Sequence, residues 1–191
     1  MTEETLTQPS SKSRARHMGA AFGCGKPKRN LDDDGLDVSK HGGVEFSAAF
    51  SAEIKTWEWS IFSVAMLHEK LATDCRWLSY VDDEGMTALH NAFIGGANKT
   101  PLDTLKAMID YVSIPHSATI RDRQDRMPLY VASLYEHRLD AIKLLAESMP
   151  HALKTKGGKE GKFPYQAAEA ASDPAQEPAI IGYLKESMDR V

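Results

Sequence analysis

One segment of the sequence returns twice in degraded form, and this repetition limits the folds that the chain can adopt. Residues 82–92 read Asp-Asp-Glu-Gly-Met-Thr-Ala-Leu-His-Asn-Ala. Residues 122–132 read Asp-Arg-Gln-Asp-Arg-Met-Pro-Leu-Tyr-Val-Ala, and residues 161–168 read Gly-Lys-Phe-Pro-Tyr-Gln-Ala-Ala. A second amphipathic segment follows each copy. Units of this kind bury their apolar faces against one another, so the sequence predicts a stack of repeated helical units.

A further match lies in the later part of the units. Leu89 of the first copy aligns with Leu129 of the second copy. Further along the chain, Leu145–Met149 reads Leu-Ala-Glu-Ser-Met and aligns with Leu184–Met188, which reads Leu-Lys-Glu-Ser-Met. Because two separate parts of the units match, chance similarity is a poor explanation of the pattern.

The first copy resembles the ankyrin repeat. It reads Thr-Ala-Leu-His-Asn-Ala over residues 87–92, and the signature of that family is Thr-Pro-Leu-His-x-Ala at a period of about 33 residues. The resemblance covers about residues 82–189. It implies an all-α, ankyrin-like solenoid of helix-turn-helix units with short tip turns. We expect three units, over about residues 82–121, 122–157 and 158–191.

The residues of the motif have physical roles in a helical unit. Gly85 can take the left-handed conformation that a tip turn requires, and Thr87 is placed to cap a helix that begins at about Ala88. Leu89 and Ala92 lie three residues apart, on one face of that helix. We expect Leu89 to fill the space between units and the small Ala92 to let neighbouring helices approach closely.

The second and third copies depart from the motif. Asp125 stands where the family has Gly. The capping Thr, the Leu and the His of the motif are also replaced in one or both copies, by Met127, Phe163, Tyr165, Tyr130 and Gln166. Each lost cap should cost about 1 kcal/mol. We therefore expect a moderately stable stack that depends on cooperation between its units.

The second helix of each unit is expected to follow similar rules. In the first unit, Thr100 is placed to cap this helix, with Pro101 at its first position. Its buried stripe is expected to comprise Leu102, Leu105, Met108, Ile109 and Val112. The last helix should begin near Pro178 and close the stack with five inward-facing residues: Ile180, Ile181, Tyr183, Leu184 and Met188.

Two regions precede the repeats. Residues 1–43 are rich in Ser, Gly, Lys, Arg and Asp with little apolar periodicity, so we expect a disordered tail in which a basic block precedes an acidic one. The stretch from Val44 to Tyr80 is apolar and aromatic and contains no Pro or Gly. We expect two or more helices there. They would form an atypical cap over residues 44–81, the first part of a repeat domain over residues 44–191.

No motif in the sequence points to catalysis or to a bound metal. His68-Glu69 lacks the second His of the metalloprotease helix, because position 72 is Ala72. The two cysteines lack the spacing of a zinc site. His90 is expected to form hydrogen bonds within the turn. We therefore expect no enzyme activity, no cofactor and no metal. The alternative of another class is an enzyme with an unrecognised site, which would need perturbed ionisable groups in a pocket.

Composition narrows the class of partner. A formal net charge of -4 and a pI of about 6.0 argue against binding nucleic acid through overall charge. No apolar run approaches the roughly 18 residues that a membrane span requires. Glu3 and Glu4 stand where a secretory signal carries positive charge. We expect a cytoplasmic monomer, or a nuclear one if Lys12–Arg16 and Lys26–Arg29 act as a split import signal.

The resemblance implies that a protein partner binds the turn tips and the exposed side of the inner helices. In the first unit these positions are Asp83, Glu84, Met86 and Ile94. In the second unit they are Arg121, Arg123, Gln124, Arg126, Leu134 and Tyr135, and in the third Lys159, Glu160 and Lys162. This surface runs from acidic to basic, and Arg and Tyr are frequent at interface hot spots. We predict a protein-interaction adaptor or scaffold. The alternative is a regulatory or inhibitory subunit of an enzyme.

Overall fold

Every regular element in the part of the chain described by the computed structural model is helical. The described residues are 46–94, 100–111, 116–135, 138–171 and 177–191. The α-helices are α1 (Ala48–Ile54), α2 (Val64–Thr73), α3 (Ala88–Ile94), α4 (Leu102–Asp110), α5 (Pro128–Tyr135), α6 (Leu139–Ser148), α7 (Pro164–Ala170) and α8 (Glu177–Arg190). Short 3-10 turns cover Trp59–Ile61, Trp77–Ser79, Ser117–Thr119 and Pro150–Lys154. The all-α prediction is confirmed for these ranges. The predicted disordered tail lies outside them.

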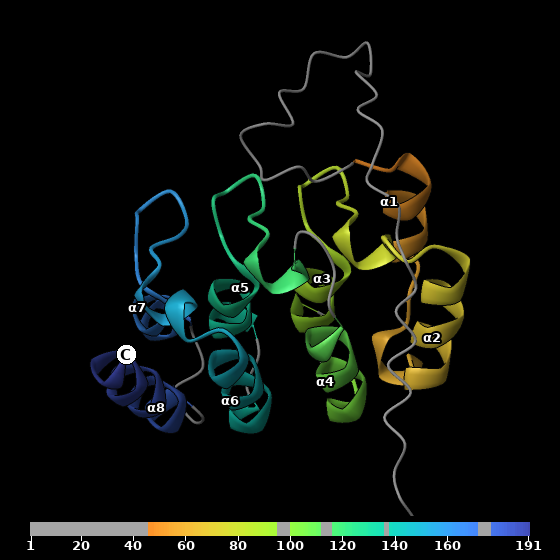
Figure 1. Ribbon diagram of the computed structural model, residues 1–191. Coiled ribbons are helices and arrows are strands. Elements are labelled where there is room, and N and C mark those ends of the chain that lie inside the picture. Colours follow the sequence, from red (N-terminus) through yellow and green to blue (C-terminus); the bar gives the residue numbers. More distant parts are fainter. Residues whose placement is uncertain (1–45, 95–99, 112–115, 136–137, 172–176) are drawn as a thin grey trace, which may run out of the picture.

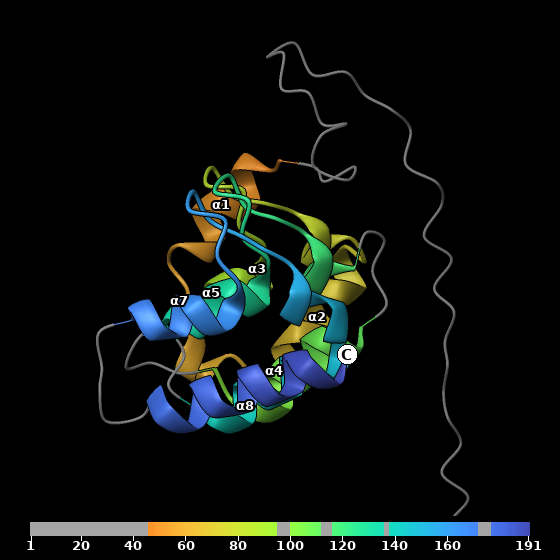
Figure 2. The same ribbon diagram turned by 90° about the vertical axis from the view of Figure 1, so that its left-hand side faces the viewer.

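The helices from α2 onward form two layers. In one layer α3 contacts α5, and α5 contacts α7. In the other layer α2 contacts α4, α4 contacts α6, and α6 contacts α8 (Figure 1). Figure 2, seen from the α7–α8 end, shows the two layers and the turns that project on one side. Each helix of the first layer is followed in the sequence by a helix of the second, so the chain builds consecutive pairs.

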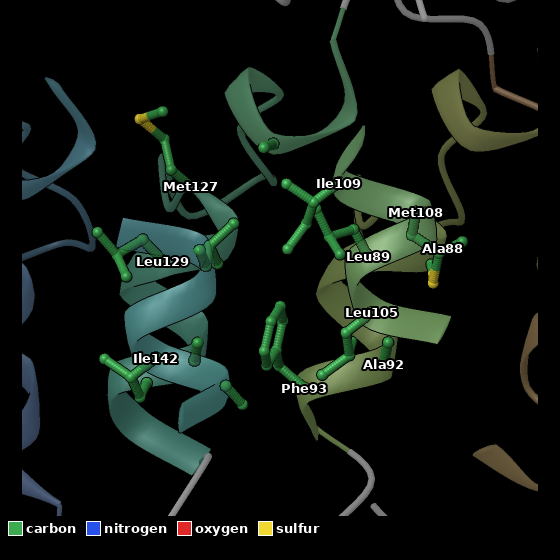
Figure 3. Packing of buried hydrophobic residues seen from close by; sticks show 14 of the residues in the cluster. Ala88, Leu89, Ala92, Phe93, Leu105, Met108, Ile109, Met127, Leu129 and Ile142 are labelled. Carbon is green, nitrogen blue, oxygen red and sulfur yellow. The ribbon is translucent and has the colours of Figure 1, made fainter. Parts of the chain in front are cut away.

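The core lies within and between these pairs. Leu89, Ala92 and Phe93 of α3 are fully buried, which confirms that the Leu and Ala of the motif face neighbouring helices. Figure 3 shows Phe93 and Ile109 lying between the α3–α4 pair and the α5–α6 pair. The residues equivalent to Ala92 in the next units are also alanines and are also buried, which allows these helices to pack closely.

The start of α4 differs from the prediction. The helix begins at Leu102, and its N-cap is Pro101, which has no side-chain oxygen. The Thr100 hydroxyl donates instead to the Ala92 carbonyl at 3.1 Å, so it satisfies the last turn of α3. Leu102 is 36% exposed rather than buried. Thr104 is buried in its place, and its hydroxyl donates to the Phe62 carbonyl at 3.0 Å.

The rest of the predicted α4 stripe follows the pattern. Leu105, Met108 and Ile109 are buried, whereas Val112 lies outside the described residues. The last helix also agrees with the prediction, because α8 begins one residue before Pro178. Of its predicted inward-facing residues, two are buried and three are half-buried against the core: Ile180 and Leu184, then Ile181, Tyr183 and Met188.

An aromatic cluster organises the first part of the described chain. The prediction of two or more helices there is confirmed by α1 and α2. Trp57 stacks on Trp77 with a centroid distance of 5.0 Å, and Trp57 also contacts Phe62 at 4.4 Å. Phe50 of α1 meets the edge of Trp77 at 5.6 Å. These rings bring α1, the turn after it and the turn before the first repeat together, in place of a regular α-helical pair.

Candidate binding surface

A tight turn precedes each of the helices α3, α5 and α7. In the first turn the Asp82 N–H donates to the Met86 carbonyl at 3.0 Å, and in the second the Asp122 N–H donates to the Arg126 carbonyl at the same distance. The third turn contains one more residue. There Gly157 and Lys162 exchange two backbone hydrogen bonds, at 2.9 and 3.1 Å. Backbone hydrogen bonds between the first and last residues therefore close all three turns, although their side chains differ.

Buried aspartates hold the first two turns together. The Asp82 Oδ1 accepts from the N–H groups two and four residues later, each at 2.9 Å. The Asp122 Oδ1 repeats both contacts at the same distances. The two residues are only 4% and 1% exposed. A buried carboxylate needs such partners, so these contacts fix the turns while meeting its requirement for hydrogen bonds.

In every turn the residue before the last has a left-handed backbone. Gly85 has φ 77°, Asp125 has φ 62° and Gly161 has φ 60°. At Gly85 the neighbouring turn also restricts the residue, because a Cβ atom there would lie 2.9 Å from the Arg123 nitrogen. The left-handed conformation predicted for Gly85 is confirmed. The second turn retains the same conformation with Asp, which tolerates it better than most non-Gly residues do.

We expect Asp125→Gly to stabilise the protein by about 0.5–1 kcal/mol, because glycine adopts a positive φ without steric cost. The gain is limited because glycine is more flexible in the unfolded chain and because the Asp125–Arg121 ion pair at 2.8 Å is lost. Urea denaturation monitored by circular dichroism measures the difference. Asp125→Ala should lower stability, since alanine loses the ion pair and retains the unfavourable backbone. If the two variants were equally stable, the conformation of this residue would not be the cause.

Neighbouring turns are joined to one another. The Glu84 carbonyl accepts from the Arg123 N–H at 3.0 Å, which joins the first turn to the second. The Arg121 Nη1 donates to the Lys156 carbonyl at 3.3 Å, which joins the second turn to the third. Asp83 contacts Lys55 of the α1 end at 2.7 Å. The turns thus form one connected row along the side of the stack (Figure 1).

His90 belongs to this network. Its Nδ1 accepts from the Thr87 N–H at 3.1 Å, and its Nε2 lies 3.1 Å from the Arg126 carbonyl, to which it donates as the neutral Nε2–H tautomer. Burial lowers its pKa from 6.5 to about 4, against the opposing effect of the Arg126 carbonyl. The prediction that His90 bonds within the turns is confirmed. Gln166 at the equivalent position of the third unit accepts from the Phe163 N–H at 3.0 Å, so it repeats one of these contacts.

The structure places most of the predicted binding residues at the surface. Seven are exposed: Asp83, Glu84, Arg123, Gln124, Tyr135, Lys159 and Glu160. Four are half-buried: Ile94, Arg121, Leu134 and Lys162. The remaining two, Met86 and Arg126, are only 6% exposed and cannot form part of an open surface.

The burial of Met86 and Arg126 has a common cause. Both occupy the last position of their turn, where the backbone is bonded back to the first residue. This position lies beneath the tip. The Arg126 Nε donates to the Asp122 Oδ2 at 2.6 Å, so the guanidinium is held inside by a buried ion pair. The spacing of an Asp followed four residues later by an Arg could have predicted this ion pair. The sequence contains that spacing only in the second turn.

Ion pairs neutralise part of the exposed charge of the turns. Arg121 pairs with Asp125, and Lys162 pairs with Glu160. The hydrogen bond between Lys162 and Glu160 raises the pKa of the lysine and lowers the pKa of the carboxyl. Hydrogen bonds from Lys55 and then Ser51 lower the pKa of Asp83 in the same way. Part of the surface charge of each turn is therefore balanced by a nearby residue.

His90 is enclosed by the turns. Both ring nitrogens of His90 are occupied by partners within the protein, so this side chain does not face a ligand. In the described residues no group of three or more His, Cys, Asp or Glu side chains is arranged to hold a metal ion. Among the same residues, none of the helices is both long enough and apolar enough to cross a membrane.

No protein-family model matches the sequence of this chain, and the search of curated proteins finds no match.

Proposed function

We propose that this protein is a protein-interaction adaptor built from ankyrin-like repeats, with the turn tips and inner helices as its binding surface. Three features support the repeat assignment. The helices α3 to α8 form consecutive pairs, each inner helix follows a tight turn, and each turn has a left-handed residue at the same position. The Leu and Ala of the motif are buried between pairs, as a repeat of this type requires.

The observation that carries the proposed function is the connected row of turns. Hydrogen bonds within each turn and between neighbouring turns hold their backbones in place. Exposed side chains of several kinds extend from this row, including Glu84, Arg123 and Lys159. A surface that is already ordered loses less conformational entropy when it binds, so more of the interaction energy contributes to affinity. Such a row suits the recognition of another protein better than it suits a reaction in a closed pocket.

Affinity capture from a cell lysate tests this proposal. Glu84→Ala, Arg123→Ala, Lys159→Ala and Tyr135→Ala in one variant should reduce the amount of captured partner by about tenfold or more, because a few interface residues carry most of the binding energy. Circular dichroism should show that the variant remains folded, since all four residues are exposed. Arg126 is left intact because its substitution would break a buried ion pair.

A control variant removes similar charges from the opposite layer. Lys106→Ala, Glu147→Ala and Arg190→Ala change exposed residues of α4, α6 and α8. This control should capture the partner as well as the unaltered protein does. The proposal would be refuted if the control lost the partner and the turn variant retained it.

A further inference from the structure

The second and third turns carry a concentration of basic side chains that the first turn lacks. We use the name basic ridge for five of them: Arg121, Arg123, Lys156, Lys159 and Lys162. Three are exposed, and Arg121 and Lys162 are half-buried, with side chains 36% and 38% exposed. The first turn instead presents Asp83 and Glu84. The row of turns is therefore polarised, with acidic residues at one end and basic residues over the other two turns.

The basic ridge is one continuous surface across two turns. The Arg121 guanidinium donates to the Lys156 carbonyl at 3.3 Å and to the Asp125 carbonyl at 3.3 Å. It therefore bridges the turns. The Lys156 ammonium lies 5.2 Å from the centroid of the Phe163 ring, which holds this cation against the base of the third turn. Because the Arg121 side chain joins the two turns, the backbone positions that carry the ridge side chains are held beside one another.

The carboxylates beside the ridge do not balance its charge. Asp125 pairs with Arg121, and Glu160 pairs with Lys162. The other three cations, Arg123, Lys156 and Lys159, form no ion pair with the described residues. Unpaired cations on neighbouring turns give this part of the row a positive potential, which favours an anionic ligand.

We propose that the partner binds this ridge through an acidic peptide segment, an inference that rests on the proposed function. Asp125 and Glu160 lie beside the cations of the ridge. A ligand must therefore avoid these two carboxylates while it contacts the neighbouring Arg and Lys side chains. A peptide can do this because it can place Asp or Glu opposite Arg123 and Lys159 and neutral residues opposite the carboxylates. A nucleic acid carries phosphates at every step and would meet both carboxylates. The acidic side chains of the first turn repel an acidic segment, so the segment should lie over the second and third turns and not over the first.

Fluorescence anisotropy tests the inference with a labelled peptide of alternating Glu and Ser and the full chain. We expect saturable binding that weakens strongly from about 0.05 M to about 0.3 M salt, since screening shortens the range of charge interactions. A peptide of alternating Gln and Ser should bind at least about tenfold more weakly. Charge reversal in Arg123→Glu with Lys159→Glu should lower the affinity for the acidic peptide by about tenfold or more.

The matched control reverses one Lys and one Arg elsewhere. Lys106→Glu with Arg190→Glu changes exposed cations of α4 and α8, each of which has an acidic partner four residues away. The affinity of this control should stay within about twofold of the unaltered chain, apart from the effect of net charge. Equal losses in the two variants would overturn the inference, because overall charge rather than the ridge would then be responsible.

Two other occupants give distinct results in the same assay. Tighter binding of a single-stranded oligonucleotide than of the acidic peptide, with the same loss on ridge reversal, would overturn the peptide assignment in favour of nucleic acid. Substitution of Asp32, Asp33, Asp34 and Asp37 by Asn tests the acidic run of this chain. A rise of about tenfold in peptide affinity would assign the ridge to that run instead. If the peptide failed to bind while lysate capture still required the turn residues, the adaptor function would stand and only this inference would fall.

Discussion

Replacing Asp122 by Ala is expected to lower the free energy of unfolding by about 3–5 kcal/mol, the largest effect we foresee for a single substitution. The carboxylate is 1% exposed and accepts from two backbone N–H groups and from the Arg126 Nε at 2.6 Å. Its removal leaves a buried guanidinium without its partner and opens the second turn. Urea denaturation at neutral pH measures the loss, with circular dichroism to show whether the variant is folded before denaturant is added.

Two comparisons separate this mechanism from a general sensitivity of the turns. Asp83→Ala removes an exposed carboxylate from the first turn and should cost much less, because solvent screens its pairing with Lys55. Adding Arg126→Met to Asp122→Ala removes the unpaired charge and should restore part of the lost stability. A double variant no more stable than Asp122→Ala would show that the lost turn contacts, and not the unpaired arginine, dominate.

Stability should also fall by up to about 3 kcal/mol as the pH decreases from 6.5 to 4, because of His90. Its pKa is lowered from 6.5 to about 4 by burial. In that window the unfolded chain binds a proton at His90 and the folded chain does not, so acid favours unfolding. Above pH 6.5 both states are neutral at this residue, and the effect disappears. Protonation would also place a hydrogen on Nδ1, which accepts from Thr87.

His90→Gln provides the comparison. Glutamine carries no proton in this range, and Gln166 already accepts from the backbone at the equivalent position. Subtracting the pH profile of the variant from that of the unaltered protein removes the contributions of the titratable groups common to both. The difference should slope by about one proton between pH 6.5 and pH 4. Parallel profiles would contradict the lowered pKa of His90.

Local sequence was sufficient to predict where α3 and α8 begin and most of the buried face of α4. The start of α3 at Ala88, the start of α8 near Pro178 and the burial of Leu89 follow from caps, proline placement and helical periodicity. The left-handed residue at Gly85 follows from glycine's lack of a Cβ atom. These features depend on contacts within a few residues, so a single sequence contains the information that predicts them. Local sequence does not predict the left-handed backbone of Asp125. This residue adopts the conformation of Gly85 within a turn that other contacts close.

Tertiary structure decided which of the turn residues face solvent. Met86 and Arg126 looked like tip residues in the sequence, yet the closure of each turn places them beneath the tip. Thr100 looked like a cap, yet its hydroxyl reaches back to α3. Those outcomes depend on partners that periodicity does not identify, such as the buried carboxylate of Asp122. The pairing of Asp83 with Lys55, the residue after α1, was likewise decided by the fold, because a side chain's partner depends on which elements the fold brings together.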